Sequence, residues 1–262
     1  MAIRQSPSPR LALWGLAGAL AGTLAALVLF APAWWLADAI ESATSGRLLL
    51  AQPRGTVWNG SAQLVLTGGE GSRDAAALPG SVRWRLRPGL GGLSAAVESD
   101  CCTREPVAVK ASPRWGGMKL EVADAQSQWP AAVLAGLGTP WNTLQIEGNL
   151  GVSTRGLSVE WVAGRLAIAG SARLEAAQLS SRLSTLRPMG SYSITLNGGP
   201  VPTLQLQTLE GALRLTGSGG WAGTRFRFNG EATAEPEREA ALANLLNIIG
   251  RRSGGRSLIT IG

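Results

Sequence analysis

Alternation of apolar and polar residues is the feature that most restricts how this chain can fold. In 81–87 the sequence is Ser-Val-Arg-Trp-Arg-Leu-Arg, so apolar side chains alternate with arginines through the whole segment. Successive side chains of a β-strand point to opposite faces, so this period of two predicts a strand with one apolar and one charged face. The same alternation predicts strands at 62–67, 107–111, 119–122, 144–152, 157–162, 165–169, 172–176, 191–196, 204–209, 212–216, 224–229 and 257–261.

Glycine separates these segments, with 35 glycines in the 262 residues. Closely spaced strands with turn residues between them and little helix are typical of an antiparallel all-β domain. Several strands open with a glycine, where a bulge or bend needs a residue without Cβ. These openings lie at 59–64, 147–152, 169–174, 210–215 and 229–234. The sequence therefore predicts a mainly β fold, built as a curved, elongated antiparallel domain.

Two short helices interrupt the strand pattern. The segment 130–137 begins with proline and is followed by Gly138, which suits the start and the end of a helix. The segment 236–249 has an apolar face at helical spacing, with Gly250 after it and Arg251 and Arg252 beyond. We expect both helices to pack on the sheet, with docking on a membrane or a partner as the alternative.

The first forty residues have the composition of a membrane anchor. Arg4 and Arg10 precede a stretch, 11–37, that holds no charged residue and ends before Asp38. A helix of this length can cross a hydrocarbon layer of roughly 30 Å. Positive charge before the stretch predicts a cytoplasmic segment 1–10, a transmembrane anchor 11–37 and a domain 38–262 beyond the membrane. The residues assigned to the anchor include Leu11, Leu20, Leu29, Trp34 and Trp35.

A cleavable signal peptide is the alternative interpretation of this stretch. The tripeptide at 31–33, Ala-Pro-Ala, loosely resembles a cleavage site. However, the apolar run is longer than the roughly 7–15 residues of a signal-peptide core. Trp34 and Trp35 also suit the aromatic belt at a membrane surface. We therefore favour an uncleaved anchor.

Charge and length set broad limits on the rest of the chain. The protein has 24 basic and 17 acidic residues, and Arg4 and Arg10 account for two of the basic excess. A modestly basic surface suits an anionic lipid bilayer or an acidic partner protein, and equally suits plain solvation. The basic residues are too dispersed for a nucleic-acid module. The length of 38–262 allows one body or two lobes, at about 46–127 and 141–262.

The residue types exclude most catalytic chemistry. The chain has no histidine, so it lacks Ser-His-Asp and Cys-His pairs and histidine metal sites. Cys101 and Cys102 are adjacent and lack zinc-site spacing; a mutual bond, free thiols and an intermolecular bridge all stay open, and we interpret the pair as incidental. Glu98 and Asp100 would share one face of a strand but belong to no motif. We expect no enzyme, no cofactor and no metal.

Tryptophan is frequent, with ten residues in the chain, and several lie beside glycine. Examples are Trp58 near Gly60, Trp115 before Gly116, and Trp221 after Gly220. A large ring can cover the bare backbone of a glycine in a curved sheet, so we favour a structural role in the core. The alternative is an apolar groove for an acyl chain or an extended peptide.

Five segments in order along the chain resemble a known family. The segments 55–62, 134–144, 186–192, 208–213 and 245–252 resemble the type II secretion system protein N family, also called general secretion pathway protein N. The motif residues that we single out are Gly55, Trp58, Gly60, Gly136, Leu137, Gly138, Pro188, Gly190, Tyr192 and Gly211. The resemblance covers nearly the whole chain.

This resemblance implies an accessory inner-membrane subunit of a Gram-negative secretion machine. Such a machine carries folded proteins from the periplasm across the outer membrane. The implied location is the inner membrane, with a single span and the C-terminal domain in the periplasm. The implied partners are other inner-membrane subunits of the system and the outer-membrane secretin. The resemblance supplies no catalytic residues and no cofactor, and the number of copies stays open.

We therefore expect a scaffold held at the membrane, where confinement makes weak contacts with neighbouring subunits sufficient. The candidate contact surfaces are an exposed sheet edge and the arginine face of Arg83, Arg85 and Arg87. Plain solvation of these arginines is the alternative. A different function also stays open, namely a carrier of lipid or another hydrophobic ligand in an apolar β groove.

Overall fold

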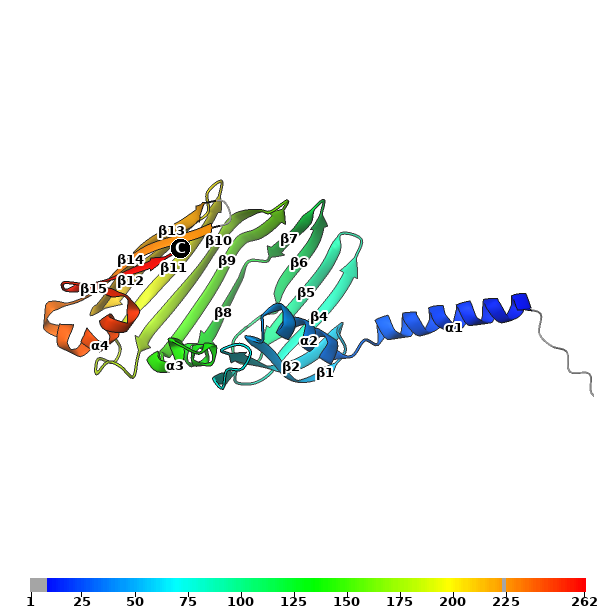
Figure 1. The fold of residues 1–262 in the computed structure, drawn as a ribbon, viewed down its shortest axis with the longest axis horizontal. Coiled ribbons are helices and arrows are strands. Elements are labelled where there is room, and N and C mark those ends of the chain that lie inside the picture. The colour runs from blue at the N-terminus through cyan, green and yellow to red at the C-terminus, as the bar shows by residue number, and fades with distance from the viewer. Residues whose placement is uncertain (1–8, 223–224) are drawn as a thin grey trace, which may run out of the picture.

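The computed structural model describes residues 9–222 and 225–262, so the expected cytoplasmic segment lies largely outside the described residues. In this part of the chain, antiparallel strands form one 16-stranded sheet along the long axis of the molecule (Figure 1). The strands are β1 Leu48–Gly55, β2 Asn59–Thr67, β3 Ala75–Ala77, β4 Val82–Gly89, β5 Gly92–Ser99, β6 Val107–Arg114, β7 Gly117–Val122, β8 Ala125–Pro130, β9 Glu147–Val162, β10 Arg165–Ser180, β11 Gly190–Gly199, β12 Thr203–Gly211, β13 Leu213–Ala222, β14 Arg225–Ala234, β15 Arg251–Ser253 and β16 Arg256–Ile261. The helices are α1 Pro9–Leu29, α2 Ala33–Ala43, η1 Ala131–Leu137, α3 Trp141–Leu144, η2 Pro236–Arg238 and α4 Glu239–Ile249. The prediction of a mainly β, antiparallel fold is confirmed.

The strands follow one another across the sheet almost in chain order. The order is β1-β2-β4-β5-β6-β7-β9-β10-β11-β12-β13-β14-β16-β15, with β3 paired to β2 and β8 paired to β9. β7 and β8 share one side of the long strand β9: Met118 lies opposite Trp161, and Ser127 lies opposite Val152. The sheet is therefore continuous between the segments 46–127 and 141–262, whose division into lobes stays a prediction.

The register places like residues beside one another on each face. Leu196 of β11 lies opposite Leu204 of β12, and the preceding residue Thr195 lies opposite Gln205. Side chains alternate along every strand, so when one apolar residue lies opposite another, the apolar residues two positions away on both strands also lie on that face. The polar residues between them lie on the reverse face. The period of two in the sequence thus becomes one apolar face and one polar face.

The stretch 11–37, expected as the anchor, is divided between two helices, and its role as an anchor stays a prediction. α1 ends at Leu29, and α2 begins at Ala33 after Pro32, whose extended backbone makes it the N-cap. Proline fixes φ and lacks an N–H, so it suits a helix start and not a helix interior. Ala33 and Ala37 are buried against Leu50, Ala62 and Trp84 of the sheet instead of facing lipid. Over the residues that the structure describes, no helix combines the length and the apolarity that crossing a membrane requires.

The helical content also differs from the two helices expected. The segment 130–137 is the 3₁₀ helix η1, and the segment 236–249 divides into η2 and α4. α2 and α3 are additional helices. α3 replaces the start of the strand expected at 144–152, so β9 begins only at Glu147. Arg251 and Arg252 belong to β15.

Buried residues gather in three clusters along one side of the sheet. α2 covers the β1 end, η1 lies over β2, β3 and β9, and α4 packs on β14, β15 and β16. The largest cluster joins Leu144, Met189, Tyr192 and Leu213 to α4. Cys102 is buried in the cluster under η1 and is bonded to Cys101, which settles the alternatives left open for this pair.

Candidate interaction surfaces

The arginine face lies on β4. Arg83, Arg85 and Arg87 are exposed and alternate with Val82, Trp84 and Leu86, which point to the other side. The Nη2 atom of Arg83 lies 3.1 Å from Oε1 of Glu98 and 3.0 Å from Oδ1 of Asp100. The two carboxylates that share one strand face are therefore counter-charges for Arg83.

Asp100 is held in its ionised form by its surroundings. The Ser81 hydroxyl donates to Oδ2 of Asp100 over 2.7 Å, and the Ser81 N–H donates over 3.0 Å. These two hydrogen bonds, with a smaller contribution from Arg83, lower the pKa of Asp100. Among the ion pairs of the described residues, none involves Arg85 or Arg87. These two arginines are thus the open positive charges of the arginine face.

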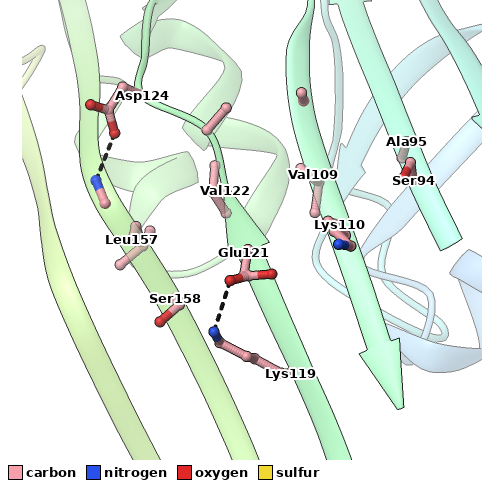
Figure 2. A pocket seen from close by; sticks show the side chains of 13 residues that line it. Ser94, Ala95, Val109, Lys110, Lys119, Glu121, Val122, Asp124, Leu157 and Ser158 are labelled. Atoms are coloured by element: carbon pink, nitrogen blue, oxygen red, sulfur yellow. Dashed lines mark hydrogen bonds and ion pairs between the residues drawn. The ribbon is translucent and has the colours of Figure 1, made fainter. Parts of the chain in front are cut away.

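A shallow hollow continues from the arginine face (Figure 2). Arg87 lies opposite Ser94, and the row continues through Lys110, Glu121 and Ser158 on successive strands. Residues of this row after Arg87 line a hollow of about 600 Å³. It lies open on the sheet surface and has no enclosing wall.

Three of the four charged side chains in the hollow have partners: Lys119 and Glu121 pair with one another, and Asp124 accepts from backbone. The Nζ atom of Lys119 lies 2.7 Å from Oε1 of Glu121, and this contact is the main cause that lowers the pKa of Glu121. Figure 2 shows Asp124 turned to the backbone of the neighbouring strand, where it accepts from the Gly156 N–H over 2.6 Å. Within 9–222 and 225–262, no cluster of acidic or sulfur side chains could hold a metal ion. The hollow is suited to polar contacts.

The polar face extends over the C-terminal half of the sheet. One row crosses it from β9 to β14 through Ser153, Arg173, Thr195, Gln205, Ser218 and Asn229. Most of these side chains are exposed. We use the name polar face for this row, its neighbours on the same side of the sheet, and the arginine face.

The apolar face is the reverse side of the same strands. Two of its rows are Leu93-Ala111-Leu120-Val159-Ile168, from β5 to β10, and Leu174-Ile194-Leu206, from β10 to β12. Except for the buried Ile168, these side chains are half-buried. They lie beyond the clusters under α2 and η1, and Leu206 alone borders the cluster under α4.

The first motif segment, 55–62, builds the core at the β1 end. A Cβ on Gly60 would collide with the ring of Trp84, the residue opposite it on β4. Trp84 also donates from Nε1 to the Val57 carbonyl over 3.0 Å. Trp58, which we expected beside Gly60, instead donates from Nε1 to the Val28 carbonyl at the end of α1 over 2.7 Å. Gly55 ends β1 in this region.

The expected pairing of tryptophan with adjacent glycine is wrong for the other two cases. Trp115 is fully exposed in a hairpin turn, and no atom lies near the Cβ position of Gly116. Trp221 packs against Phe226, with ring centroids 4.6 Å apart. It is Phe228 that covers the glycines Gly217 and Gly230. Aromatic rings do cover glycines, but the partner comes from the neighbouring strand or from a position two residues away.

The later motif segments meet in the core under α4. Gly190 lies opposite Gly211, and a Cβ on Gly190 would lie 2.6 Å from the Glu210 carbonyl oxygen and 2.7 Å from the Tyr192 hydroxyl. Tyr192 is buried, donates to the Leu213 carbonyl over 3.1 Å, and has its pKa raised by burial. Pro188 lies in the loop just before this strand.

The middle motif segment lies in η1 and α3. Gly136 is buried at the backbone of Leu66, Leu137 ends η1, and Gly138 is its C-cap. Leu144 of α3 belongs to the cluster under α4. The motif residues therefore do not form one reactive site. They build the cores that hold the helices on the sheet.

The comparison with protein families gives a match that covers most of the chain. A family model described as type II secretion system (T2SS), protein N matches residues 46–259. The match begins just before β1 and ends within β16, so it spans nearly the whole sheet. The comparison with curated proteins gives no match, and the comparison with solved structures gives none either.

Proposed function

The chain belongs to the type II secretion system protein N family, and on that premise we propose that it is an accessory scaffold subunit of a secretion machine. In this role it supports the export of folded proteins from the periplasm across the outer membrane by holding other subunits of the system together. The partners that we propose are inner-membrane subunits and the outer-membrane secretin.

The scaffold role rests on one observation. The family model matches the part of the chain that forms the continuous sheet, and the motif residues lie in the cores of this sheet. Function on a fold is argued from its site, and here Lys119 and Glu121 of the hollow pair with one another while Asp124 is bound to backbone. A long, rigid sheet instead offers an extended surface for partners. This supports a role in binding other proteins and not in catalysis.

The polar face is a better contact surface than the sheet edge. The free edge strand β1 has a register shift between Ala51 and Arg54 and carries Pro53. Bulges and prolines are the devices that protect an edge from pairing with another strand. Arg85 and Arg87 are exposed and unneutralised, so we place the contact with an acidic partner surface on the arginine face.

We propose that the apolar segment 11–29 holds the protein at the inner membrane as a single-pass anchor, with 1–10 in the cytoplasm and the sheet in the periplasm. The described part of α1 by itself falls short of a membrane span, so this proposal rests on the sequence. The support is the apolar sequence 11–29 after Arg4 and Arg10, and the exposure of Leu16, Leu20 and Leu29. The protein should stay in the membrane pellet after alkaline extraction, and a periplasm-dependent reporter fused after Gly262 should be active. Release into the soluble fraction, or an inactive reporter, would reject this location.

The contact surface is tested by charge reversal in the full-length chain. The variant Arg85→Glu/Arg87→Glu leaves the ion pairs of Arg83 intact, so the fold should be kept. We expect it to lose most of its co-purification with other secretion subunits and to leave secreted proteins in the periplasm. The matched control is Arg155→Glu/Arg227→Glu, on exposed arginines further along the polar face that make no ion pair among the described residues. Equal co-purification by both variants would reject the arginine face.

A further inference from the structure

The disulfide between Cys101 and Cys102 joins two neighbours in the chain. In the chain-entropy model, a disulfide stabilises a fold by closing a loop in the unfolded chain, and the gain grows with the length of that loop. Adjacent cysteines close no such loop, so this bond adds almost nothing to global stability by that route. It instead fixes the local backbone, because the small ring that it closes contains the peptide bond between the two residues. The effect of this disulfide is therefore local.

The two sulfur atoms of this bond have different surroundings. Cys101 is exposed, whereas Cys102 is 4 % exposed and belongs to the cluster of Leu78 and Val133 under η1. The Ser99 hydroxyl donates to Sγ of Cys101 over 3.3 Å, since a bonded sulfur carries no proton. A reagent in solution can therefore reach Sγ of Cys101 much more easily than Sγ of Cys102.

The disulfide lies in the turn that follows β5, residues 99–103, which we name the cysteine turn. The N–H groups of Cys102 and Thr103 both donate to the Ser99 carbonyl over 3.2 Å. The Ser99 N–H donates in return to the Thr103 hydroxyl over 2.8 Å. These bonds close the turn and leave the Cys102 carbonyl for a partner outside it.

That partner is β8. The Gln128 N–H donates to the Cys102 carbonyl over 2.8 Å, and Thr103 forms a β-bridge with Ser127. Among the described strands, β8 pairs only with β9. The cysteine turn therefore borders β8 along the edge that β9 leaves free, and we name this contact the β8 seam.

The β8 seam closes the sheet between its two halves. β7 pairs with the second half of β9, and β8 pairs with the first half (Figure 1). Next to the first half of β9, the sheet thus continues through β8 and the cysteine turn to the end of β5. η1 begins directly after β8, and its Val133 packs in the same cluster as Cys102. The conformation of the cysteine turn therefore bears on both β8 and η1.

We propose that the Cys101–Cys102 disulfide is a site of thiol–disulfide exchange, which accepts a dithiol reductant at Cys101 and whose reduction opens the β8 seam. A thiolate of the reductant attacks Sγ of Cys101, the bond between the cysteines breaks, and Sγ of Cys102 leaves as a thiolate that takes up a proton. The second thiolate of the reductant then attacks the reductant's own sulfur in the mixed disulfide and releases Cys101, which also takes up a proton. The protein gains two electrons and two protons, and the reductant becomes a disulfide.

Reduction frees the torsions of Cys101 and Cys102 that the ring restricts. Rotation about these bonds moves the Cys102 carbonyl away from the Gln128 N–H and weakens the packing of Cys102 under η1. The rest of the sheet keeps its pairing, because the bond cross-links no distant strands. The cysteine pair thus has a role that its sequence context did not indicate, and this role does not depend on the scaffold function.

The first test measures reduction of the folded, full-length chain in detergent. The protein is incubated with dithiothreitol or with reduced thioredoxin, and free thiols are alkylated and located by mass spectrometry. We expect reduction of the bond with an unchanged circular dichroism spectrum, and about tenfold faster alkylation of Cys101 than of Cys102. Reduction by thioredoxin assigns a protein reductant, and reduction by dithiothreitol alone assigns a small dithiol. A bond that resists both reagents until urea unfolds the chain would overturn the proposal.

The second test compares hydrogen–deuterium exchange in the oxidised and the reduced chain. Peptides that contain Gln128 and η1 should exchange about tenfold faster after reduction, because their amide hydrogens become accessible when the β8 seam opens. Peptides of β11 and β12, which lie beyond β10 in the sheet, are the internal control and should not change. Equal exchange at Gln128 in the two redox states would show that the bond does not hold the seam, and the proposal would be wrong.

A pair of variants separates the bond from the rest of the turn. Cys101→Ser removes the bond and leaves Cys102 in the core, so it should exchange like the reduced chain with or without a reductant. The matched control is Arg104→Ser, at an exposed residue just after the cysteine turn, which keeps the disulfide and should respond to reductant like the unchanged chain. Slow exchange at Gln128 in Cys101→Ser would contradict the proposal. If this variant does not fold, the exchange of the unchanged chain before and after reduction still decides the outcome.

Discussion

The indole of Trp84 lies directly on the backbone of Gly60, its partner across the β2–β4 pair. The ring occupies the space that any side chain at 60 would need, and its Nε1 is fixed by the Val57 carbonyl. This contact joins the first motif segment to the middle of β4. It therefore couples the core at the β1 end to the strand that displays the arginine face.

Gly60→Ala should destabilise the protein by about 2–4 kcal/mol, because the new Cβ would meet Trp84 and lie 2.8 Å from the carbonyl oxygens of Arg54 and Thr56. Urea unfolding followed by circular dichroism measures the change. The control is Gly91→Ala, where no atom lies within 4 Å of the Cβ position. A Gly60→Ala protein as stable as the control would contradict the contact.

Tyr192 should make stability fall at alkaline pH. Burial raises the pKa of Tyr192 above its ordinary value of 10.0. Above that value the unfolded chain releases the tyrosine proton while the folded chain keeps it, so the unfolded state is favoured increasingly as pH rises. The slope approaches about 1.4 kcal/mol per pH unit.

Tyr192→Phe removes this titration and should flatten the alkaline fall in stability. At neutral pH it should cost about 1 kcal/mol, because the Leu213 carbonyl loses its buried donor. The chain has a single tyrosine, so phenolate absorbance reports this group alone. Ionisation of the folded protein near pH 10 would show that Tyr192 is not buried.

Ser81→Ala should raise the pKa of Asp100 more than Arg83→Gln does. The Ser81 hydroxyl is the largest cause that lowers this pKa, and the charge of Arg83 is the smallest. Carbon-13 NMR titration of the aspartate carboxyls measures both shifts. A larger rise with Arg83→Gln would show that the ion pair dominates over the hydrogen bonds.

Leu246→Ala should loosen α4 from the sheet at a cost of about 2–5 kcal/mol, because Leu246 is fully buried in the largest cluster. Ile248→Ala, two residues further along the same helix, is the control: Ile248 is 45 % exposed, and its loss should cost under about 1 kcal/mol. Thermal unfolding of the two variants gives the comparison. Equal losses would mean that α4 is not held by its buried face.

Local alternation predicted many of the strands, because the period of two records directly which side chains share a face. It did not predict β1, β3, β5, β8 and β15, which lie outside the predicted segments. The segment 81–87 becomes β4 with the expected faces. The long strands β9 and β10 were predicted as pairs of short ones, divided near Gly156 and Gly170. Gly156 and Gly170 have no ladder partners and lie at a register shift, but the pairing of β9 with β10 resumes on either side of them, and local sequence does not contain that cross-strand support.

α2 could not be separated from the apolar stretch before it by composition. Residues 33–37 are as apolar as α1, and only Pro32 marks the break. The burial of Ala33 and Ala37 depends on Leu50 and Trp84, which lie farther along the chain. Such long-range packing is set by the fold and overrides a local hydropathy pattern.

The arginine face could be predicted in part. Its exposure follows from alternation along β4 alone. Its neutralisation at Arg83 follows from the β4–β5 register, which places Glu98 opposite Arg83. The glycines covered by aromatic rings could not be predicted for the same reason, namely that strand pairing is not visible in local sequence. Trp84 and Gly60 lie on two different strands that are paired in the sheet.

Because β4 to β7 and β9 to β14 each follow one another across the sheet as antiparallel neighbours, these two runs of strands are modular along their length. If one hairpin is removed or duplicated, every residue of the other strands stays on the face of the sheet that it already occupies. Adjacent strands are spaced about 4.8 Å apart, so each such event changes the span by about 10 Å. A sheet of another length with the same two ends would therefore differ from this one by whole hairpins.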